Sequence, residues 1–150
     1  MIFQKFMKII KYLIQFIIIC IFYVIFKIIG VKLSSFLSGK LFEIIGPIFR
    51  SKKIINNNIK KAFPDYNSKE TNKIGSSMWN NYGRVFAEYL YMKNFRNGNL
   101  SKNISIEGEN ILLNIKDQNQ KVVFISGHFS NFELMAMQID KIGIKIGAIY

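Results

Sequence analysis

The longest unbroken hydrophobic pattern of the chain lies near its N-terminus. Between Lys11 and Lys27, the only amide or charged side chain belongs to Gln15. If both lysines extend their ammonium groups toward water, Ile9–Ile29 forms an apolar helix about 31 Å long, which is enough to cross a bilayer core. No small-residue cleavage site follows the segment. The pattern therefore predicts a retained transmembrane or membrane-anchor helix over residues 1–30, rather than a removable signal peptide.

The next segment, residues 31–98, mixes apolar and basic positions at helical spacing. Gly46-Pro47 predicts an interruption of the first helix in this segment. A basic helix is expected to end near Ala62, because Phe63-Pro64-Asp65 has the composition of a turn. We therefore predict a basic, amphipathic helical region between the anchor and the C-terminal part of the chain.

A longer helix is predicted after this turn, roughly over Glu70–Met92, with Ser68 or Thr71 as its N-terminal cap. Its apolar and aromatic side chains recur on one side of the helix: Ile74, Met78, Tyr82, Val85, Phe86, Tyr89 and Leu90. A stripe of this kind usually packs into a core, so it predicts a buried face rather than a binding surface.

From residue 99 onward, short apolar segments alternate with helical ones. The expected elements are a short strand (Asn103–Gly108), a helix (Glu109–Asp117), an apolar strand (Lys121–Ser126), a second helix up to Ile142 that Gly143 ends, and a last strand (residues 144–150). Such alternation is typical of the α/β class and predicts a βαβαβ, mostly parallel sheet. Because the chain stops in the last strand, residues 99–150 are expected to be the incomplete first part of an α/β domain.

The positive charge of the chain is concentrated around its most apolar part. Residues 1–66 carry eleven Lys and Arg against Glu43 and Asp65, whereas residues 67–150 carry ten against seven acidic residues. This distribution favours an anionic membrane surface as partner. No RNA-binding aromatic motif, zinc-ligand spacing or recognition helix accompanies the charge, so nucleic acid is not expected as a partner. The single cysteine, Cys20, excludes an intramolecular disulfide.

The basic residues also predict an orientation. Three lysines precede the apolar segment and six basic residues follow it closely: Lys5, Lys8 and Lys11, then Lys27, Lys32, Lys40, Arg50, Lys52 and Lys53. By the positive-inside rule, the body of the protein is expected on the cytoplasmic side of the membrane.

The only histidine, His128, follows the apolar strand and precedes a predicted helix. At the carboxyl end of a strand, where α/β proteins bind ligands, an imidazole can act as a general base, with Glu133 fixing its tautomer. The alternative is that Ser130 and Glu133 form a capping box at the start of the helix, beside an incidental histidine. A serine hydrolase centred on Ser126 is disfavoured, because the G-x-S-x-G turn is missing and no second histidine exists. From spacing alone, the first two interpretations stay open.

The segment "GHFSNFE" (Gly127–Glu133) resembles the H-x4-[DE] motif of lysophospholipid-type acyltransferases, in the glutamate form of the bacterial lipid A biosynthesis acyltransferases. The order of "NNNIKKAFPDYNSKE", "GRVFAEYL" and "ISIEGENIL" behind an apolar N-terminus is similar to that family. The resemblance covers all 150 residues of this chain, which correspond to only about the first half of a typical member of the family. The family's tyrosine–arginine segment would begin at Tyr150, and its arginine is not in this sequence.

The resemblance implies transfer of an acyl chain from a thioester, usually on acyl carrier protein, to a hydroxyl of a lipid A precursor. His128 would be the general base and Glu133 its partner, with no metal or other cofactor, at the cytoplasmic side of a bacterial inner membrane. A glycerophospholipid acyltransferase would use the same base with a smaller acceptor. A basic, membrane-anchored interaction protein without catalysis is the alternative outside the enzymes.

Overall fold

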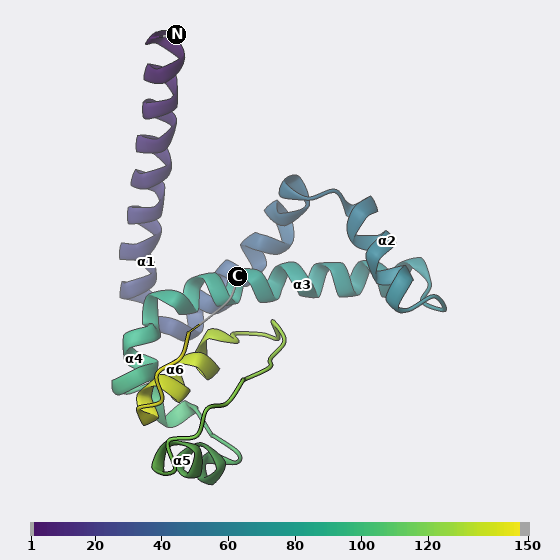
Figure 1. Ribbon diagram of the computed structural model, residues 1–150. Coiled ribbons are helices and arrows are strands. Elements are labelled where there is room, and N and C mark those ends of the chain that lie inside the picture. Colours follow the sequence, from purple (N-terminus) through teal and green to yellow (C-terminus); the bar gives the residue numbers. More distant parts are fainter. Residues whose placement is uncertain (1, 148–150) are drawn as a thin grey trace. The chain divides into compact units, whose positions relative to one another are not determined.

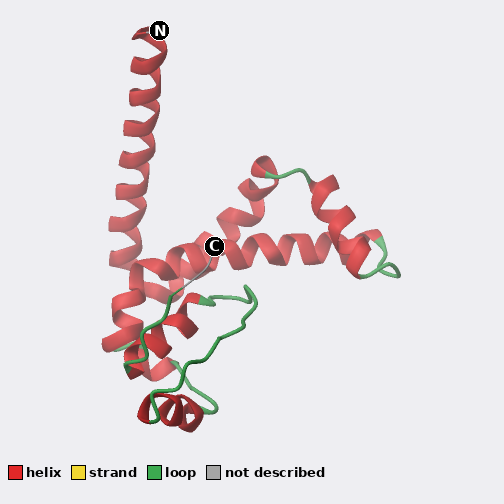
Figure 2. Cartoon of the chain, in the orientation of Figure 1, coloured by secondary structure: helices red, strands yellow, loops and turns green. Residues whose placement is uncertain are grey.

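The computed structural model describes residues 2–147 and consists of two compact units, one ending at Leu90 (unit 1) and one beginning at Tyr91 (unit 2). Helices and loops make up the described residues, as Figure 2 shows. In chain order the elements are α1 (Ile2–Phe49), α2 (Lys52–Ala62), α3 (Ser68–Glu88), the 3-10 turn η1 (Tyr89–Tyr91), α4 (Met92–Asn97), the 3-10 turn η2 (Ser101–Asn103), α5 (Glu109–Asp117) and α6 (Glu133–Ile142).

Helix α1 changes direction at Gly30, whose φ of 79° and ψ of 165° lie outside helical geometry. Glycine has no Cβ and adopts a positive φ without a steric penalty. The hydroxyl of the fully buried Ser34 donates to the carbonyl oxygens of Phe26 (3.0 Å) and Gly30 (2.8 Å), which satisfies acceptors at the break. We call residues 2–29 the N-terminal arm and residues 31–49 the C-terminal arm.

The N-terminal arm contains the predicted anchor. By length and composition, α1 qualifies as a membrane-crossing helix, and it is the one helix among the described residues to do so. Only 6% of its most apolar window is buried, as expected of a helix that meets lipid rather than a protein core. At the end of the arm, Lys27 Nζ donates to the carbonyl oxygen of Leu90 (2.7 Å) and lies over the ring of Tyr23. The ammonium group of this lysine is thus held between a backbone carbonyl and an aromatic ring at the end of the apolar segment.

The C-terminal arm packs closely on α3 because small residues line the contact. A Cβ atom on Gly83 would overlap the carbonyl oxygen of Ser38, and one on Gly39 would lie 2.9 Å from Asn80 Nδ2. Ser38 itself is almost completely buried. Small side chains let two helix backbones approach at short distance, so this interface gains dispersion contacts along its length.

The predicted interruption at Gly46-Pro47 is wrong, because α1 continues to Phe49 with Pro47 inside it. The glycine serves a different purpose: a Cβ on Gly46 would overlap the indole ring of Trp79, which packs against the bare backbone. Pro47 lies in the last turn of the helix, where the loss of its N–H costs one hydrogen bond.

The predicted end of the basic helix at Ala62 is confirmed, but the cap of the following helix is different. Asn67, rather than Ser68 or Thr71, caps α3. Its side chain accepts from the amides of Lys69 (2.9 Å) and Glu70 (3.1 Å), and Glu70 Oε2 accepts from the Asn67 amide (2.8 Å). This reciprocal capping box satisfies three N–H groups at the start of the helix.

In unit 2, α5 spans the residues predicted for it, and α6 ends at Ile142 with Gly143 in left-handed geometry (φ 102°), also as predicted. The Arg96 guanidinium forms an ion pair with the Asp140 carboxylate (2.6 Å), which connects α4 to α6. Both helices of the predicted alternation therefore form.

The predicted βαβαβ sheet is wrong, because no strand is present among residues 2–147. The apolar segment at Lys121–Ser126 has no ladder partner, and its Val123 and Ile125 are 86% and 94% exposed. A strand exists only where a neighbour accepts and donates its backbone hydrogen bonds, and apolar composition alone does not supply one. Of the predicted last strand, residues 148–150 lie outside the described part of the chain.

Candidate active site

The candidate catalytic residues lie on a sharp bend that leads into α6. The amide of Phe129 donates to the carbonyl oxygen of Gly127 (2.9 Å), and Ser130 adopts a positive φ of 47°. The ring of Phe129 occupies the space that a side chain at position 127 would need. A larger residue at position 127 would therefore require the exposed ring of Phe129 to move.

His128 is exposed on this bend. Its ring stacks against Phe132, with the ring centroids 4.2 Å apart and the planes inclined by 30°. Within the described part of the chain, no hydrogen bond or ion pair involves the imidazole. A nitrogen with a free lone pair on an accessible ring can accept a proton from an incoming hydroxyl, which is the chemical requirement for a general base.

Glu133 is the first residue of α6 and is half-buried. The structure brings Glu133 and His128 to the same bend, but among residues 2–147 no hydrogen bond or ion pair joins them. The carboxylate lies in the first turn of the helix, where the positive end of the helix dipole favours negative charge.

The capping box predicted as an alternative role for Ser130 and Glu133 is wrong. The N-cap position of α6 is Phe132, and no side chain caps this helix. The first turn is closed by backbone bonds instead, from the amide of Leu134 to Asn131 O (3.1 Å) and from the amide of Met135 to Phe132 O (3.1 Å). The carboxylate of Glu133 is therefore not used to start the helix.

An apolar cavity of about 480 Å³ adjoins the start of α6. Leu134, the neighbour of Glu133, lines it together with Met135 and Ile139, and Phe124 contributes from the apolar segment before the bend. Further lining residues come from α5 and from residues 104–108. The cavity is mostly hydrocarbon-lined and would accept an apolar group in preference to a charged one.

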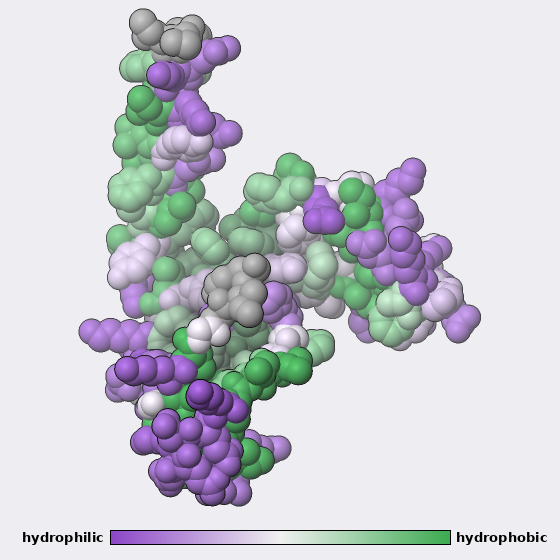
Figure 3. Space-filling model, in the orientation of Figure 1, coloured by the Kyte–Doolittle hydropathy of each residue, from purple (hydrophilic) through white to green (hydrophobic). Residues whose placement is uncertain are grey.

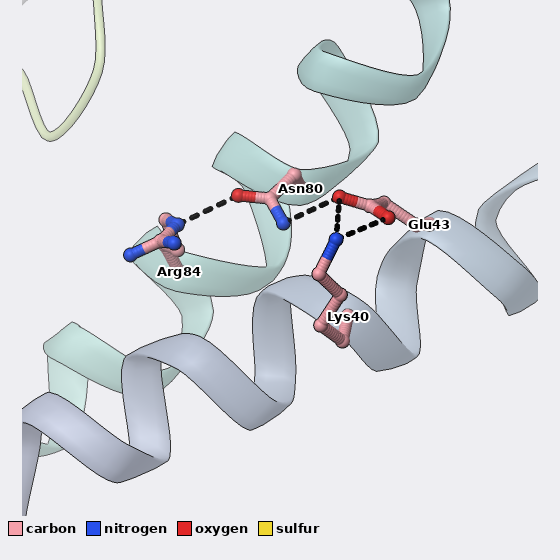
Figure 4. A network of polar contacts seen from close by, with 4 residues as sticks. All are labelled: Lys40, Glu43, Asn80 and Arg84. Carbon is pink, nitrogen blue, oxygen red and sulfur yellow. Dashed lines mark hydrogen bonds and ion pairs between the residues drawn. The ribbon is translucent and has the colours of Figure 1, made fainter.

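A second set of polar side chains lies in unit 1, between the C-terminal arm and α3 (Figure 4). Lys40 Nζ contacts both carboxylate oxygens of Glu43 (3.0 and 3.2 Å), Asn80 Nδ2 donates to Glu43 Oε1 (2.6 Å), and Arg84 Nε donates to Asn80 Oδ1 (2.6 Å). The Lys40 ammonium beside Glu43 lowers the pKa of that carboxyl group, and the hydrogen bond from Asn80 acts in the same direction. A carboxylate held in its charged form by cations connects two helices and does not exchange protons near neutral pH.

This network could not be predicted from sequence patterns, because Glu43 and Asn80 are 37 positions apart. Among the described residues, no group of three His, Cys, Asp or Glu side chains could hold a metal ion. The bend at His128 is therefore the candidate site for proton transfer in the described chain.

Comparison with known proteins identifies one family. The sequence model described as "Bacterial lipid A biosynthesis acyltransferase" matches residues 1–150, which is the whole chain and includes the bend at His128. No curated protein matches the chain. No solved structure matches it either.

Proposed function

Since this chain belongs to the family of bacterial lipid A biosynthesis acyltransferases, we propose that it moves a fatty acyl chain from a thioester on acyl carrier protein to a hydroxyl of a lipid A precursor. The observation that carries the proposal is the family match over the whole chain, which contains His128 and Glu133 at the spacing of the acyltransferase motif.

In the proposed reaction, a nitrogen of His128 accepts the proton of the acceptor hydroxyl as its oxygen attacks the thioester carbonyl carbon. The new C–O bond forms and the C–S bond breaks. The proton on the imidazolium then passes to the departing thiolate, so the products are the ester and the free thiol of the carrier. The exposure of the imidazole supports this role, because the acceptor must reach it.

Glu133 is proposed to accept a hydrogen bond from the second ring nitrogen of His128 once substrate is bound. Such a bond fixes the tautomer and stabilises the imidazolium. Catalytic hydrogen bonds are often absent or long before substrate binds, so rotation of the exposed imidazole away from Phe132 would complete the pair.

The distribution of apolar and basic residues supports a place at the membrane. The exposed N-terminal arm would hold the site at the bilayer where an amphiphilic, phosphorylated acceptor resides. By the positive-inside rule, the basic residues after the arm favour the cytoplasmic side for the body of the protein. The net charge of +12 would also attract an acidic carrier protein over long range. The apolar cavity beside Leu134 would suit the hydrocarbon part of the acyl group.

The test is transfer of a labelled acyl chain from acyl carrier protein to a lipid A precursor. We expect His128→Ala and His128→Gln to lower kcat/KM by about 10²–10⁴-fold, because a positioned base is lost and the sequence has no second histidine. Ser130→Ala is the matched control on the same bend, and it should keep both rate and stability because Ser130 does not cap α6. Full activity in His128→Ala would contradict the mechanism.

Glu133→Gln tests the partner role separately. The amide keeps the size of the side chain but cannot stabilise an imidazolium, so turnover should fall strongly while the melting temperature stays near that of the wild type. An unchanged rate in Glu133→Gln would exclude Glu133 as the partner of His128. Lysophosphatidic acid is included as a competing acceptor, and its preferential acylation would show a glycerophospholipid acyltransferase instead.

A further inference from the structure

The end of the C-terminal arm presents large apolar side chains that nothing in unit 1 covers. Ile44, Ile48 and Phe49 are 75%, 81% and 77% exposed. Figure 3 shows hydrophobic residues along the N-terminal arm and again at the end of α1, next to the hydrophilic residues of α2. Single exposed apolar residues are ordinary, but a contiguous group marks a contact with a protein or a membrane.

Ile44 and Ile48 share a face of the C-terminal arm with Leu33 and Leu37, and Lys40 lies on this face between the two pairs. Leu33, Leu37, Ile44 and Ile48 are all exposed and fall within about 60° of one another around the helix, at about 100° per residue. The buried serines of the arm, such as Ser38, lie on the other side, against α3. The arm therefore contacts its own protein through small residues and turns its large apolar residues outward, which reverses the pattern of a soluble surface helix.

Basic residues surround the end of this face. Arg50, Lys52 and Lys53 follow directly and are exposed, and no acidic residue occurs between Glu43 and Asp65. Apolar side chains beside uncompensated cations are the composition by which interfacial helices bind anionic bilayers. A protein partner of this surface would have to be both apolar and acidic over the same small area.

Within unit 1, the corner that carries this surface lies on the anchor's side of α3. In Figure 1, the N-terminal arm and the corner between α1 and α2 both rise to the same side of α3. The hydrogen bond from Lys27 to Leu90 ties the N-terminal arm to η1, directly after α3, and the close contact at Gly83 ties the C-terminal arm to α3. A membrane crossed by the first arm is therefore on the side that the corner faces.

We propose that the corner patch, formed by Ile44, Ile48, Phe49 and Ile54 with Arg50, Lys52 and Lys53, inserts into the surface of the same anionic bilayer as a second membrane contact. The apolar side chains enter the boundary between headgroups and acyl chains, about 5–10 Å deep, and the cations bind lipid phosphates. The inference rests on the membrane attachment in the proposed function and goes beyond it.

A second contact has a mechanical consequence for the protein. A single spanning helix can adopt a range of tilts in the bilayer, and unit 1 would tilt with it. Two contacts, on opposite sides of the Gly30 break, hold α3 at a fixed inclination to the bilayer plane. Unit 1 then lies at the bilayer in one orientation instead of many, so less orientational freedom is lost when it contacts membrane lipids.

The experiment measures how deeply single positions enter the bilayer, in the full chain. In a Cys20→Ser background, Phe49→Cys is labelled with bimane and reconstituted into vesicles of phosphatidylethanolamine and phosphatidylglycerol that contain lipids spin-labelled on the acyl chain. The matched control is Ser77→Cys, which is exposed on α3 and about 200° around the helix from the buried Gly75. Flotation of the vesicles first shows that the chain is attached.

We expect stronger bimane quenching at position 49 than at position 77, by about twofold or more, as for a side chain below the headgroups. The difference should shrink when Lys52→Gln and Lys53→Gln are added, or when phosphatidylcholine replaces the anionic lipid. Equal, weak quenching at both positions would overturn the second contact. A label at position 49 that instead self-quenches in proportion to protein density, without lipid quenching, would also overturn it and identify a second copy of the chain as the partner.

A chain that does not float with the vesicles fails the proposed membrane attachment itself. A chain that floats with the vesicles while position 49 stays in water gives a different result. It contradicts the second membrane contact and leaves the proposed function unaffected.

Discussion

The two units of the chain differ in how closely their helices pack and in how much of their large apolar side chains is exposed. In unit 1, small residues such as Gly39, Ser38 and Gly83 bring two long helices into close contact, and a polar network crosses the interface. In unit 2, short helices are joined by extended segments, and large apolar side chains such as Val123 and Ile125 are almost fully exposed. Close packing in this chain therefore depends on small residues and not on large apolar ones.

The comparison shows that hydrophobicity in this sequence does not mark the packed core. The most apolar window is the exposed N-terminal arm, whereas the most deeply buried side chains include Ser34, Ser38 and Thr71. Where a helix meets lipid, as proposed for the N-terminal arm, large apolar residues face the bilayer, and small residues let helices approach one another. A core predicted from apolar stripes is then placed on the wrong face.

Hydrogen exchange would give the largest contrast between the units. The amides of residues 121–126 donate no hydrogen bond to another described residue, so they should exchange at nearly the rate of an unfolded peptide. The amides of Val85 and Ala87 lie in the buried part of α3 and should exchange at least about 10³-fold more slowly. Mass spectrometry of overlapping peptides in detergent measures both.

Equal protection in the two segments would contradict the difference between the units, because it would show that the amides of residues 121–126 have hydrogen-bond partners in solution. If protection of residues 121–126 appears only when acyl carrier protein is added, the segment becomes ordered on binding of the donor, and the difference between the units holds for the free protein.

The local elements could be predicted from the sequence because their signals are local. The end of α2 at Ala62, the span of α5 and the end of α6 at Gly143 follow from turn residues and helical spacing, and all three are confirmed. The sheet could not be predicted reliably, because strand pairing depends on partners elsewhere in the chain and apolar composition does not identify them.

The stripe predicted as the core of α3 fails for a related reason. Val85 is buried, but Tyr82, Phe86 and Tyr89 are between 42% and 56% exposed, and the contact with the C-terminal arm uses Gly83. Periodicity reports which residues share a face and does not report what covers that face. Gly46 is a similar case: glycine beside proline predicts a helix break, whereas Gly46 makes room for Trp79 inside α1.

For the candidate site, the sequence located the bend but not its internal contacts. His128 was predicted to lie in the turn before a helix, and it does, because α6 begins at Glu133. The predicted capping role of Ser130 was wrong, since the backbone of residues 131–135 closes the first turn. Whether His128 and Glu133 act together stays a prediction, which the variants described above test.

Two alanine substitutions in α3 test the close helix contact of unit 1. We expect Gly83→Ala to destabilise unit 1 by about 1–3 kcal/mol, because the new Cβ meets the backbone of Ser38 and forces the helices apart. Gly75→Ala is the matched control: its Cβ would lie 3.4 Å from Ile55, an ordinary contact, and alanine favours the helix by up to about 1 kcal/mol.

The readout for both variants is thermal unfolding followed by the fluorescence of Trp79, the only tryptophan, which packs against Gly46 within unit 1. A higher melting temperature in both variants would mean that the helices are not in close contact at Gly83. A decrease in both would indicate that any side chain on this face of α3 is costly, so that the contact is not specific to one glycine.

The smallest expected effect concerns the polar network and its dependence on pH. Because Lys40 and Asn80 hold the pKa of Glu43 below its ordinary value, the folded state favours the carboxylate. The resulting stabilisation is fully present above the pKa of the unfolded state, about 4.3, and is lost as the pH falls through the lower pKa of the folded state. Wild type should therefore melt slightly above Glu43→Gln at pH 7, and the two should converge in acid.

Lys40→Met identifies the cause of this pH dependence. Without the ammonium group, the pKa of Glu43 should return toward its ordinary value. The melting temperatures of Lys40→Met and Lys40→Met/Glu43→Gln should therefore differ less at pH 7 than those of wild type and Glu43→Gln. Lys40 is largely exposed, with 55% of its side chain accessible, so salt screens its charge and each difference should decrease further in high salt. A difference between wild type and Glu43→Gln that is constant from pH 7 into acid would mean that Glu43 acts through its shape and hydrogen bonds alone. The network would then connect the helices of unit 1 through hydrogen bonds and packing, and the charge of Glu43 would not contribute to the difference between the two units.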